Sequence, residues 1–211
     1  MMTRIRQFMF VVAAVAMLLG PITTVEAAEE RNYLLATAST GGTYYPVGVA
    51  LSTLVKVKLQ PKQKIGMSAI NSAGSGENIK LLRENEVQFA ILQGLYGAYA
   101  WNGTGPIESE GPQKNLRSVS MLWQNVEHYA VLKKFAKTGT ISDMVALKGE
   151  AMSMGKKNSG TLGSNTVILG NLGVDIEKDY NLIYVGYGPT ADALQNGQIS
   201  GFGIPAGVPA S

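Results

Sequence analysis

Three glycine-rich segments carry the residue types in this chain that suit the binding of a small anion. Residues 39–46 combine hydroxyl side chains with two adjacent glycines, and related segments occur at residues 71–78 and 158–163. Glycine lets the backbone approach a ligand closely, and a helix that starts at such a segment directs N–H groups and partial positive charge toward it. Because little catalytic chemistry accompanies these segments, we expect them to hold an anion rather than to transform it.

Within these segments we distinguish side chains that donate hydrogen bonds to a ligand from side chains that cap the following helix. In the second segment we expect Ser75 to cap a helix, which leaves Ser72 and Asn78 free to face a ligand. Aromatic residues such as Tyr44 and Tyr96 either wall the same cleft or pack in the core. The alternative for all three segments is ordinary turn chemistry between strands and helices of an α/β protein.

Composition limits the other kinds of chemistry. The chain has no cysteine and one histidine, His128, which excludes thiolate nucleophiles and multi-histidine metal sites. We find no dinucleotide or P-loop fingerprint in these segments and expect neither cofactor nor metal. The formal net charge is +3 without a strong basic cluster, so we expect no nucleic-acid partner. A hydrolase that uses Ser159 or Ser75 with His128 is the enzymatic alternative, although no catalytic residue is assigned.

The N-terminus predicts export. Residues 1–28 contain two arginines, an apolar block that is too short to cross a bilayer, and small residues that suit a signal peptidase. We interpret them as a signal peptide, which directs the rest of the chain to the periplasm, with an uncleaved anchor as the alternative.

Strands and helices alternate along the remaining chain, which predicts an α/β fold with mostly parallel strands. In the first part we expect strands at residues 33–38, 65–70 and 87–92, and a loop at residues 102–115. Later elements include an extended run at residues 116–123, an N-cap at Ser142 and the strand 198–202. Two of the glycine-rich segments precede the loop and one follows it, so we expect a site that closes between two lobes.

The same motifs in the same order resemble the TAXI family, the solute-binding proteins of TRAP (tripartite ATP-independent periplasmic) transporters. The resemblance rests on Ser-Thr-Gly-Gly-Thr-Tyr-Tyr-Pro at residues 39–46, on Gly-Ser-Gly-Glu-Asn at 74–78, and on Ala-Gly-Val-Pro at 206–209. It implies a two-lobed periplasmic binding protein fold of the type II kind. The implied lobes are residues 29–115 and 116–203, and residues 204–211 begin the segment that returns to the first lobe.

The resemblance also implies a function and a set of binding residues. The protein would be a monomer that captures a small carboxylate or amino-acid solute, such as glutamate or 2-oxoglutarate, and delivers it to a TRAP membrane permease. A solute-binding sensor that reports to a membrane receptor is the alternative. Members of the family are longer, so the chain resembles one truncated at its C-terminus. The implied ligand-binding residues are Ser39, Gly41, Gly42, Thr43, Tyr44, Ser72, Gly74, Ser75, Asn78, Gln93, Ser159, Gly160, Thr161 and Val208.

Overall fold

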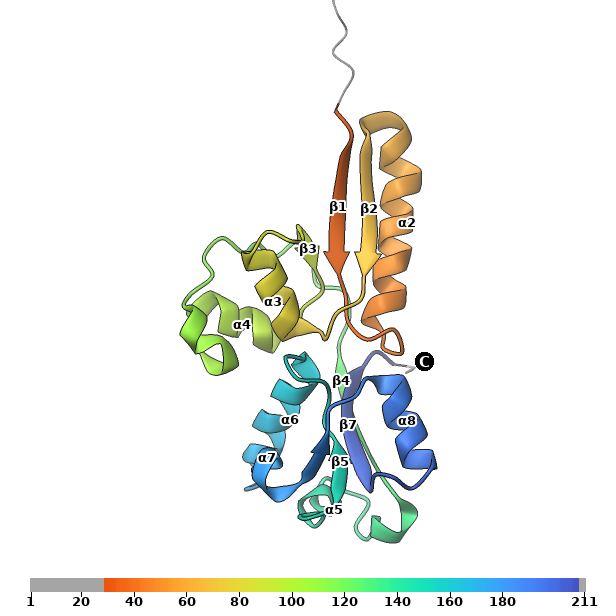
Figure 1. Cartoon of the computed structure of the whole chain (residues 1–211), viewed down its shortest axis with the longest axis vertical. Coiled ribbons are helices and arrows are strands. Elements are labelled where there is room, and N and C mark those ends of the chain that lie inside the picture. Colours follow the sequence, from red (N-terminus) through yellow and green to blue (C-terminus); the bar gives the residue numbers. More distant parts are fainter. Residues whose placement is uncertain (1–28, 209–211) are drawn as a thin grey trace, which may run out of the picture.

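Two separate β-sheets organise the chain in the computed structural model, which describes residues 29–208. The first sheet and its helices, residues 31–110, form the upper half of Figure 1, and the second sheet with its helices, residues 126–206, forms the lower half. The signal-peptide prediction for residues 1–28 and the last part of the return segment lie outside the described residues. No helix of the described part has the length and apolar character that a membrane crossing requires.

The upper half is built on a parallel sheet of three strands in the order β2-β1-β3. Its strands are β1 (Arg31–Ala36), β2 (Ile65–Ile70) and β3 (Phe89–Ala90). Each strand is followed by a helix, namely α2 (Tyr44–Gln63), α3 (Ser75–Arg83) and α4 (Gly94–Asn102), and the 3₁₀ helix η1 (Gly105–Glu110) ends the half. Parallel strands need such crossovers, and they bring the starts of all three helices to the same edge of the sheet.

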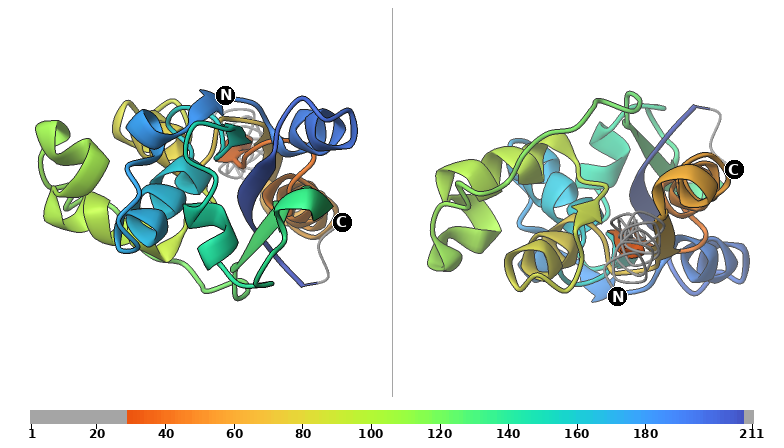
Figure 2. Two further views of the ribbon diagram at one scale, coloured as in Figure 1. Left: turned by 90° about the horizontal axis from the view of Figure 1, so that it is seen from below. Right: turned by 90° about the horizontal axis from the view of Figure 1, so that it is seen from above.

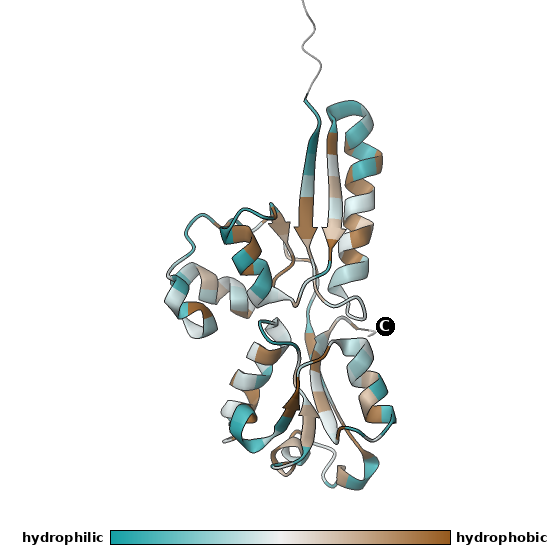
Figure 3. Ribbon diagram, in the orientation of Figure 1, coloured by the Kyte–Doolittle hydropathy of each residue, from teal (hydrophilic) through white to brown (hydrophobic). Residues whose placement is uncertain are grey.

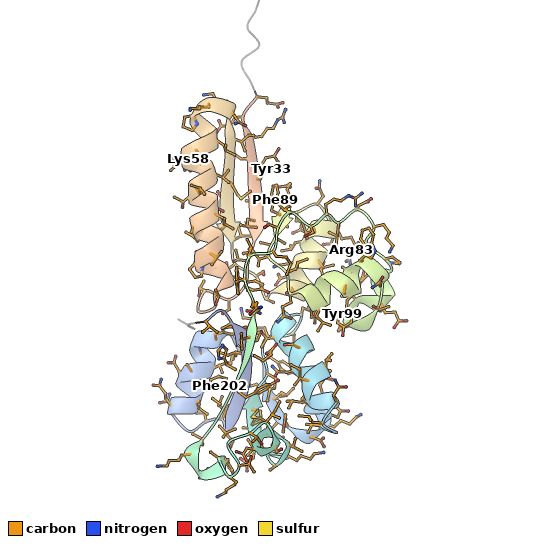
Figure 4. All side chains as sticks on the ribbon, turned by 180° about the vertical axis from the view of Figure 1, so that it is seen from behind. Tyr33, Lys58, Arg83, Phe89, Tyr99 and Phe202 are labelled. Atoms are coloured by element: carbon orange, nitrogen blue, oxygen red, sulfur yellow. The ribbon has the colours of Figure 1, made fainter. Side chains whose placement is uncertain are left out.

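Burial in the upper half increases toward the edge where the strands end. Strand β1 is exposed at Arg31 and fully buried at Ala36, and Figure 3 shows the matching change from hydrophilic to hydrophobic colour along the strand. Tyr33 and Phe89 pack edge to face with their ring centroids 5.6 Å apart (Figure 4). The end-on views show α4 and η1 on one side of the molecule and α2 and α8 on the other (Figure 2). Because burial along β1 increases toward Ala36, the end of the sheet that lies next to the lower half is the better covered one.

The lower half has a mixed sheet in the order β4-β7-β5-β6. Strands β4 (Val126–Val131) and β7 (Gly201–Ala206) are antiparallel, whereas β5 (Ala151–Ser153) pairs in parallel with β7 and with β6 (Asn181–Ile183). The 3₁₀ helix η2 (Lys133–Phe135) follows β4. The core is a cluster of buried apolar side chains from the strands and from the surrounding helices, with Met144, Met152, Met154, Leu169 and Ile176 fully buried. The helices are α5 (Ser142–Val145), α6 (Gly160–Gly170), α7 (Ile176–Asp179) and α8 (Tyr187–Gln195).

Three local predictions were wrong. Residues 116–123 form no strand, because they cross between the halves; Val119 and Met121 in this segment are more than 80% exposed, at 82% and 86%. The strand predicted at residues 87–92 shortens to Phe89–Ala90, since its partner β1 ends at Ala36. Ser142 is the first residue of α5 rather than its N-cap, and its own N–H is bonded to the Thr140 hydroxyl.

Candidate functional site

A small cavity of about 30 Å³ lies between the two halves and receives residues from both. The chain segments that end the strands of each sheet meet there, in the waist between the upper and lower halves of Figure 1. Most of the residues that the sequence suggested for binding line this cavity. They are Ser39, Gly42, Thr43, Tyr44, Gly74, Ser75, Gln93, Ser159, Gly160 and Thr161.

Four helices begin at the cavity wall. Helices α2 and α3 of the upper half start at Tyr44 and Ser75, and helices α6 and α8 of the lower half start at Gly160 and Tyr187. The first N–H groups of a helix have no partner within the helix, and the helix dipole places partial positive charge at the same end. The cavity therefore offers N–H donors and a positive potential from both halves, which suits an anion.

One full positive charge adds to these dipoles. Lys156 lies at the cavity wall in the loop between β5 and α6, and it is the only lysine or arginine among the described lining residues. Asn125, from the segment that crosses between the halves, is a further polar lining residue. Charged donors form stronger hydrogen bonds to oxyanions than neutral donors do. Lys156 is therefore the strongest candidate for a direct charge interaction with a guest.

The two tyrosines of the wall remain neutral phenols. Burial raises the pKa of Tyr44 to about 12, with the Ser75 hydroxyl opposing this rise, and burial also raises the pKa of Tyr187. The Tyr187 hydroxyl lies 2.8 Å from the Thr161 hydroxyl and donates to the Pro205 carbonyl oxygen at 2.9 Å. Tyr187 thus joins the first turn of α6 to the end of β7 and fixes one side of the cavity.

Direct hydrogen bonds hold the two halves against each other around the cavity. The Glu77 N–H donates to the Asn158 carbonyl oxygen at 3.0 Å, and the Tyr96 hydroxyl donates to the Ser159 carbonyl oxygen at 3.2 Å. In addition, the Gly207 N–H donates to the Thr43 hydroxyl oxygen at 3.1 Å. These contacts bring helix starts of opposite halves together, and the small cavity volume fits this closed arrangement.

Gly41 does not line the cavity; it packs against the start of α8. A Cβ atom at residue 41 would stand 3.0 Å from the Gly188 nitrogen at the start of α8, so a side chain there would crowd the backbone of the lower half. Gly74 lines the cavity with φ +123°, a backbone conformation that favours glycine. The glycines of the first two segments therefore permit the halves to approach.

Ser72 and Asn78 do not line the cavity, and the prediction that they stay free for a ligand was wrong. The Ser72 hydroxyl donates to Asn78 Oδ1 at 2.6 Å, and Asn78 Nδ2 donates to the carbonyl oxygens of Thr37 and Ile91 at 2.7 and 2.9 Å. Ser75 does not cap α3 through its side chain, because its hydroxyl accepts from the Gln93 N–H at 3.0 Å. These buried polar groups fasten the strand ends to the helix starts.

Val208 also lies away from the cavity. Its side chain is 73% exposed and borders a neighbouring surface hollow together with Trp123 and Val47. The return segment thus passes beside the first turn of α2 without placing Val208 among the cavity-lining residues.

Within the described residues, neither Ser159 nor Ser75 is hydrogen-bonded to His128, as the hydrolase alternative requires. The Ser159 hydroxyl donates to the Lys156 carbonyl oxygen and accepts from the Leu162 N–H, as an N-cap does. His128 Nε2 is buried without a hydrogen-bond partner within residues 29–208. In the same residues no group of three histidine or acidic side chains is arranged to hold a metal ion.

Sequence reasoning missed a fourth segment of the same kind, Gly186-Tyr187, and the lysine beside the third one. Helix α8 begins Tyr187-Gly188-Pro189, and α2 begins Tyr44-Tyr45-Pro46, so both starts share a tyrosine two residues before a proline. Lys156 precedes the third glycine-rich segment by two residues. A search for the Tyr-x-Pro helix start, and a slightly longer third segment, would have found both.

The comparisons with known proteins agree with this architecture. The model of the NMT1-like family matches residues 35–211. The alkanesulfonate-binding protein SsuA from Xanthomonas axonopodis pv. citri, bound to MOPS, is similar in structure with a TM-score of 0.53 at 15% identity. That alignment covers 85% of this chain and 56% of SsuA.

Two phosphonate-related proteins are similar in structure with nearly the same TM-score as SsuA. The binding protein component of an ABC phosphonate transporter (PA3383) from Pseudomonas aeruginosa gives a TM-score of 0.55 at 12% identity, over 84% of this chain and 58% of that one. PhnD1 from Prochlorococcus marinus in complex with methylphosphonate gives a TM-score of 0.55 at 13% identity, over 83% of this chain and 64% of that one. The chain thus spans about three fifths of these proteins and has the two-lobed α/β fold of periplasmic solute-binding proteins.

Proposed function

This chain belongs to the NMT1-like family, and from that premise we propose that it is the solute-binding subunit of a transporter, which captures a small anion between its two lobes. The observation that carries the proposal is the meeting of four helix starts from both halves, together with Lys156, at one cavity. Such donors bind oxyanions without the need for a catalytic group.

The guest is a small carboxylate, of the glutamate or 2-oxoglutarate type. The resemblance of residues 39–46 and 74–78 to the TAXI family supports this class and a TRAP permease as the partner. The similar structures include an alkanesulfonate-binding protein and a protein in complex with methylphosphonate, and sulfonates and phosphonates share the oxyanion chemistry of carboxylates. Residues 29–115 and 116–203 are the proposed lobes, and residues 1–28 are the proposed signal peptide, which places the protein in the periplasm.

The proposed binding residues are those whose backbone or side chain reaches the cavity. Hydroxyl and phenol groups of Ser39, Thr43 and Tyr44 act from the upper lobe, and Lys156, Thr161 and Tyr187 act from the lower lobe. Closure of the lobes brings both sets onto one guest, which excludes water and strengthens each hydrogen bond. Ser72, Asn78 and Gly41 support the site from behind its wall.

Isothermal calorimetry on the purified chain tests this function. The panel consists of L-glutamate, 2-oxoglutarate, methanesulfonate and methylphosphonate, and we expect saturable binding of at least one carboxylate. Lys156→Gln should weaken that binding roughly ten- to hundredfold, as expected for the loss of a charged hydrogen bond.

Lys157→Gln provides the matched control. Lys157 is the next residue but is exposed, with its Nζ 4.9 Å from the ring centroid of Tyr184. This variant should bind as the unaltered chain does. A folded protein that binds no anion of the panel, or equal effects of the two lysine variants, would contradict the proposal. Loss of uptake of the same solute in a host without this chain tests its role in transport.

A further inference from the structure

One acidic side chain, Glu127, lies beside the cavity and takes no part in the site described above. It belongs to β4, opposite Pro205 of β7 in the antiparallel register, and Pro205 lines the cavity. Residues that face each other in an antiparallel pair point to the same side of the sheet. Asn125, two residues earlier, also lines the cavity. Glu127 is therefore placed at the cleft end of the lower lobe.

The carboxylate of Glu127 forms no ion pair with any of residues 29–208. Its Oε2 atom is buried and has no hydrogen-bond partner within residues 29–208, and the described ion pairs do not include it. An unpaired charge at such a position is unfavourable, because solvation is lost without a compensating interaction. Any second negative charge in the cavity adds to this cost.

The electrostatic influence of Glu127 reaches the cavity wall. Its negative charge contributes to the raised pKa values of Tyr44 and Tyr187, which stand on the two lobes. Burial raises the pKa of Glu127 itself, and the Ser164 hydroxyl and the His128 ring oppose this rise only in part. Helix α6 and strand β7 face it with the uncharged residues Ser164 and Pro205. The titratable groups that interact with it are His128 and Tyr129 of its own strand, Tyr187 of α8 and Tyr44 of α2, and the one charged residue of the described cavity wall is Lys156.

We propose that Glu127 is a specificity-determining residue that makes the cleft select its guest by charge, so that a guest with two negative charges binds well only when Glu127 takes up a proton. This inference rests on the proposed function of the cleft. Near the cavity, Lys156 and an ionised Glu127 cancel in formal charge, whereas protonation of Glu127 leaves one net positive charge. Protonation of Glu127 should hardly change the affinity for a neutral zwitterion, should raise the affinity for a monoanion slightly, and should raise the affinity for a dianion most.

The direction of the pH dependence follows from linkage. A bound anion raises the pKa of Glu127 further, because the two negative charges repel each other. Affinity for the anion is then greatest below the pKa of the free protein and falls as the pH rises through the pKa of the complex. A further rise of one unit in the pKa of Glu127 corresponds to about a tenfold difference in affinity between the two limits.

Three solutes of similar size separate this effect from shape recognition. Glutamine, glutamate and 2-oxoglutarate carry net charges of roughly 0, −1 and −2 at neutral pH, from the ordinary pKa values of their groups. Calorimetry between pH 5.5 and 8 in bis-tris and in imidazole, two cationic buffers of different ionisation enthalpy, measures affinity and proton uptake together. The unaltered chain should lose about tenfold in affinity for 2-oxoglutarate over this range and should take up protons on binding it.

The variant Glu127→Gln should bind 2-oxoglutarate about ten times more tightly than the unaltered chain at pH 8, with no proton uptake and an almost flat profile. Glutamine should bind equally to both proteins. Glu177→Gln, which alters an exposed acid of α7, is the matched control and should retain the pH dependence. His128→Gln should retain it as well, which separates Glu127 from the neighbouring histidine.

Three results would overturn this assignment. An unchanged pH profile in Glu127→Gln is the first, and a loss of proton uptake in His128→Gln alone is the second. The third is a loss of glutamate and glutamine affinity in Glu127→Gln, which would make the carboxylate an acceptor for the solute ammonium group. If a variant fails to fold, the unaltered chain alone still tests the proposal, because binding of 2-oxoglutarate without proton uptake would contradict it. Absence of binding to every solute of the panel would instead refute the proposed function itself, and this inference with it.

Discussion

The hydroxyl of Tyr96 donates a hydrogen bond to the carbonyl oxygen of Ser159 at 3.2 Å, across the boundary between the two lobes. Tyr96 is anchored in the core of the upper lobe beside Ile79 and Ala100, and Ser159 is the N-cap of α6 in the lower lobe. A rigid side chain of one lobe thus holds the helix start that forms the wall of the cavity in the other. The same hydrogen bond therefore holds the two lobes together and fixes this wall of the cavity.

Removing this hydrogen bond should favour the open form. Tyr96→Phe keeps the ring in its core position but deletes the hydroxyl, which contributes about 1 kcal/mol to the closed state. We expect the affinity for the bound anion to fall about fivefold, with little change in melting temperature. Calorimetry and small-angle scattering measure the two effects.

Tyr99→Phe is the control for that change. The two rings pack edge to face with centroids 5.7 Å apart, but Tyr99 makes no hydrogen bond across the lobes in the described residues. Equal affinity losses in both variants would show that the Tyr96–Ser159 hydrogen bond does not contribute to closure.

Gly76 of α3 should tolerate a methyl group in the open form but not in the closed one. A Cβ atom there would stand 2.6 Å from the Asn158 carbonyl oxygen of the lower lobe. We expect Gly76→Ala to lower anion affinity about tenfold through this overpacking, while the ligand-free protein is as stable as before or slightly more stable, because alanine favours a helix. Gly97→Ala in α4, where nothing lies within 4 Å, should leave affinity unchanged. A marked loss of stability in Gly76→Ala without ligand would argue against a clash that exists only on closure.

Asn78 should matter for stability rather than for direct contact with the guest. Its amide joins Thr37, Ile91 and Ser72 in the buried strand ends of the upper lobe. Asn78→Ala leaves the buried Ile91 carbonyl oxygen without a donor and the Thr37 carbonyl oxygen with the Ser72 hydroxyl alone, and we expect the free energy of unfolding to fall by about 2 kcal/mol in urea titrations. Asn181→Ala removes one exposed hydrogen bond to Gly149 and should cost less than about 1 kcal/mol. If Asn78→Ala were as stable as the unaltered chain, the hydrogen bonds of Asn78 would not stabilise the strand ends of the upper lobe.

Asp143 should make the protein sensitive to acid. Burial alone raises the pKa of its carboxyl, but hydrogen bonds from Thr138, Gly139 and Lys137 outweigh burial and hold the pKa below its ordinary value. Because the folded pKa is the lower one, the stabilisation is complete above the unfolded pKa of about 3.9 and is lost as the pH falls through the folded value.

The variant Asp143→Asn should therefore melt below the unaltered chain at pH 7, and the difference should shrink toward pH 3. Asp192→Asn, at an exposed position of α8, is the control and should follow the unaltered chain at every pH. If the difference in melting temperature between Asp143→Asn and the unaltered chain did not depend on pH, the charge of Asp143 would not contribute to the stability of the protein.

Local chemistry explains why much of the fold could be predicted. The strand at residues 65–70 matches its prediction, and α6 begins where Ser159 precedes a glycine-rich helix start, since side chains of that kind cap helices wherever they occur. Strand β3 and the crossing segment at residues 116–123 could not be predicted in the same way. Their state depends on whether a partner strand lies alongside, and that partner is distant in sequence.

The sequence by itself determined which segments combine glycines, hydroxyls and helix starts, the features on which the proposed anion site rests, because these features act through neighbouring residues of the same chain. Only the tertiary structure decided which members of those segments meet at the cavity. Ser72 and Asn78 have the same residue types as the lining groups, yet long-range hydrogen bonds bury them behind the wall. Lys156 and Tyr187 line the cleft, and Glu127 pairs with the lining residue Pro205, because strand ends of two sheets meet there, a relation between distant residues that no local pattern contains.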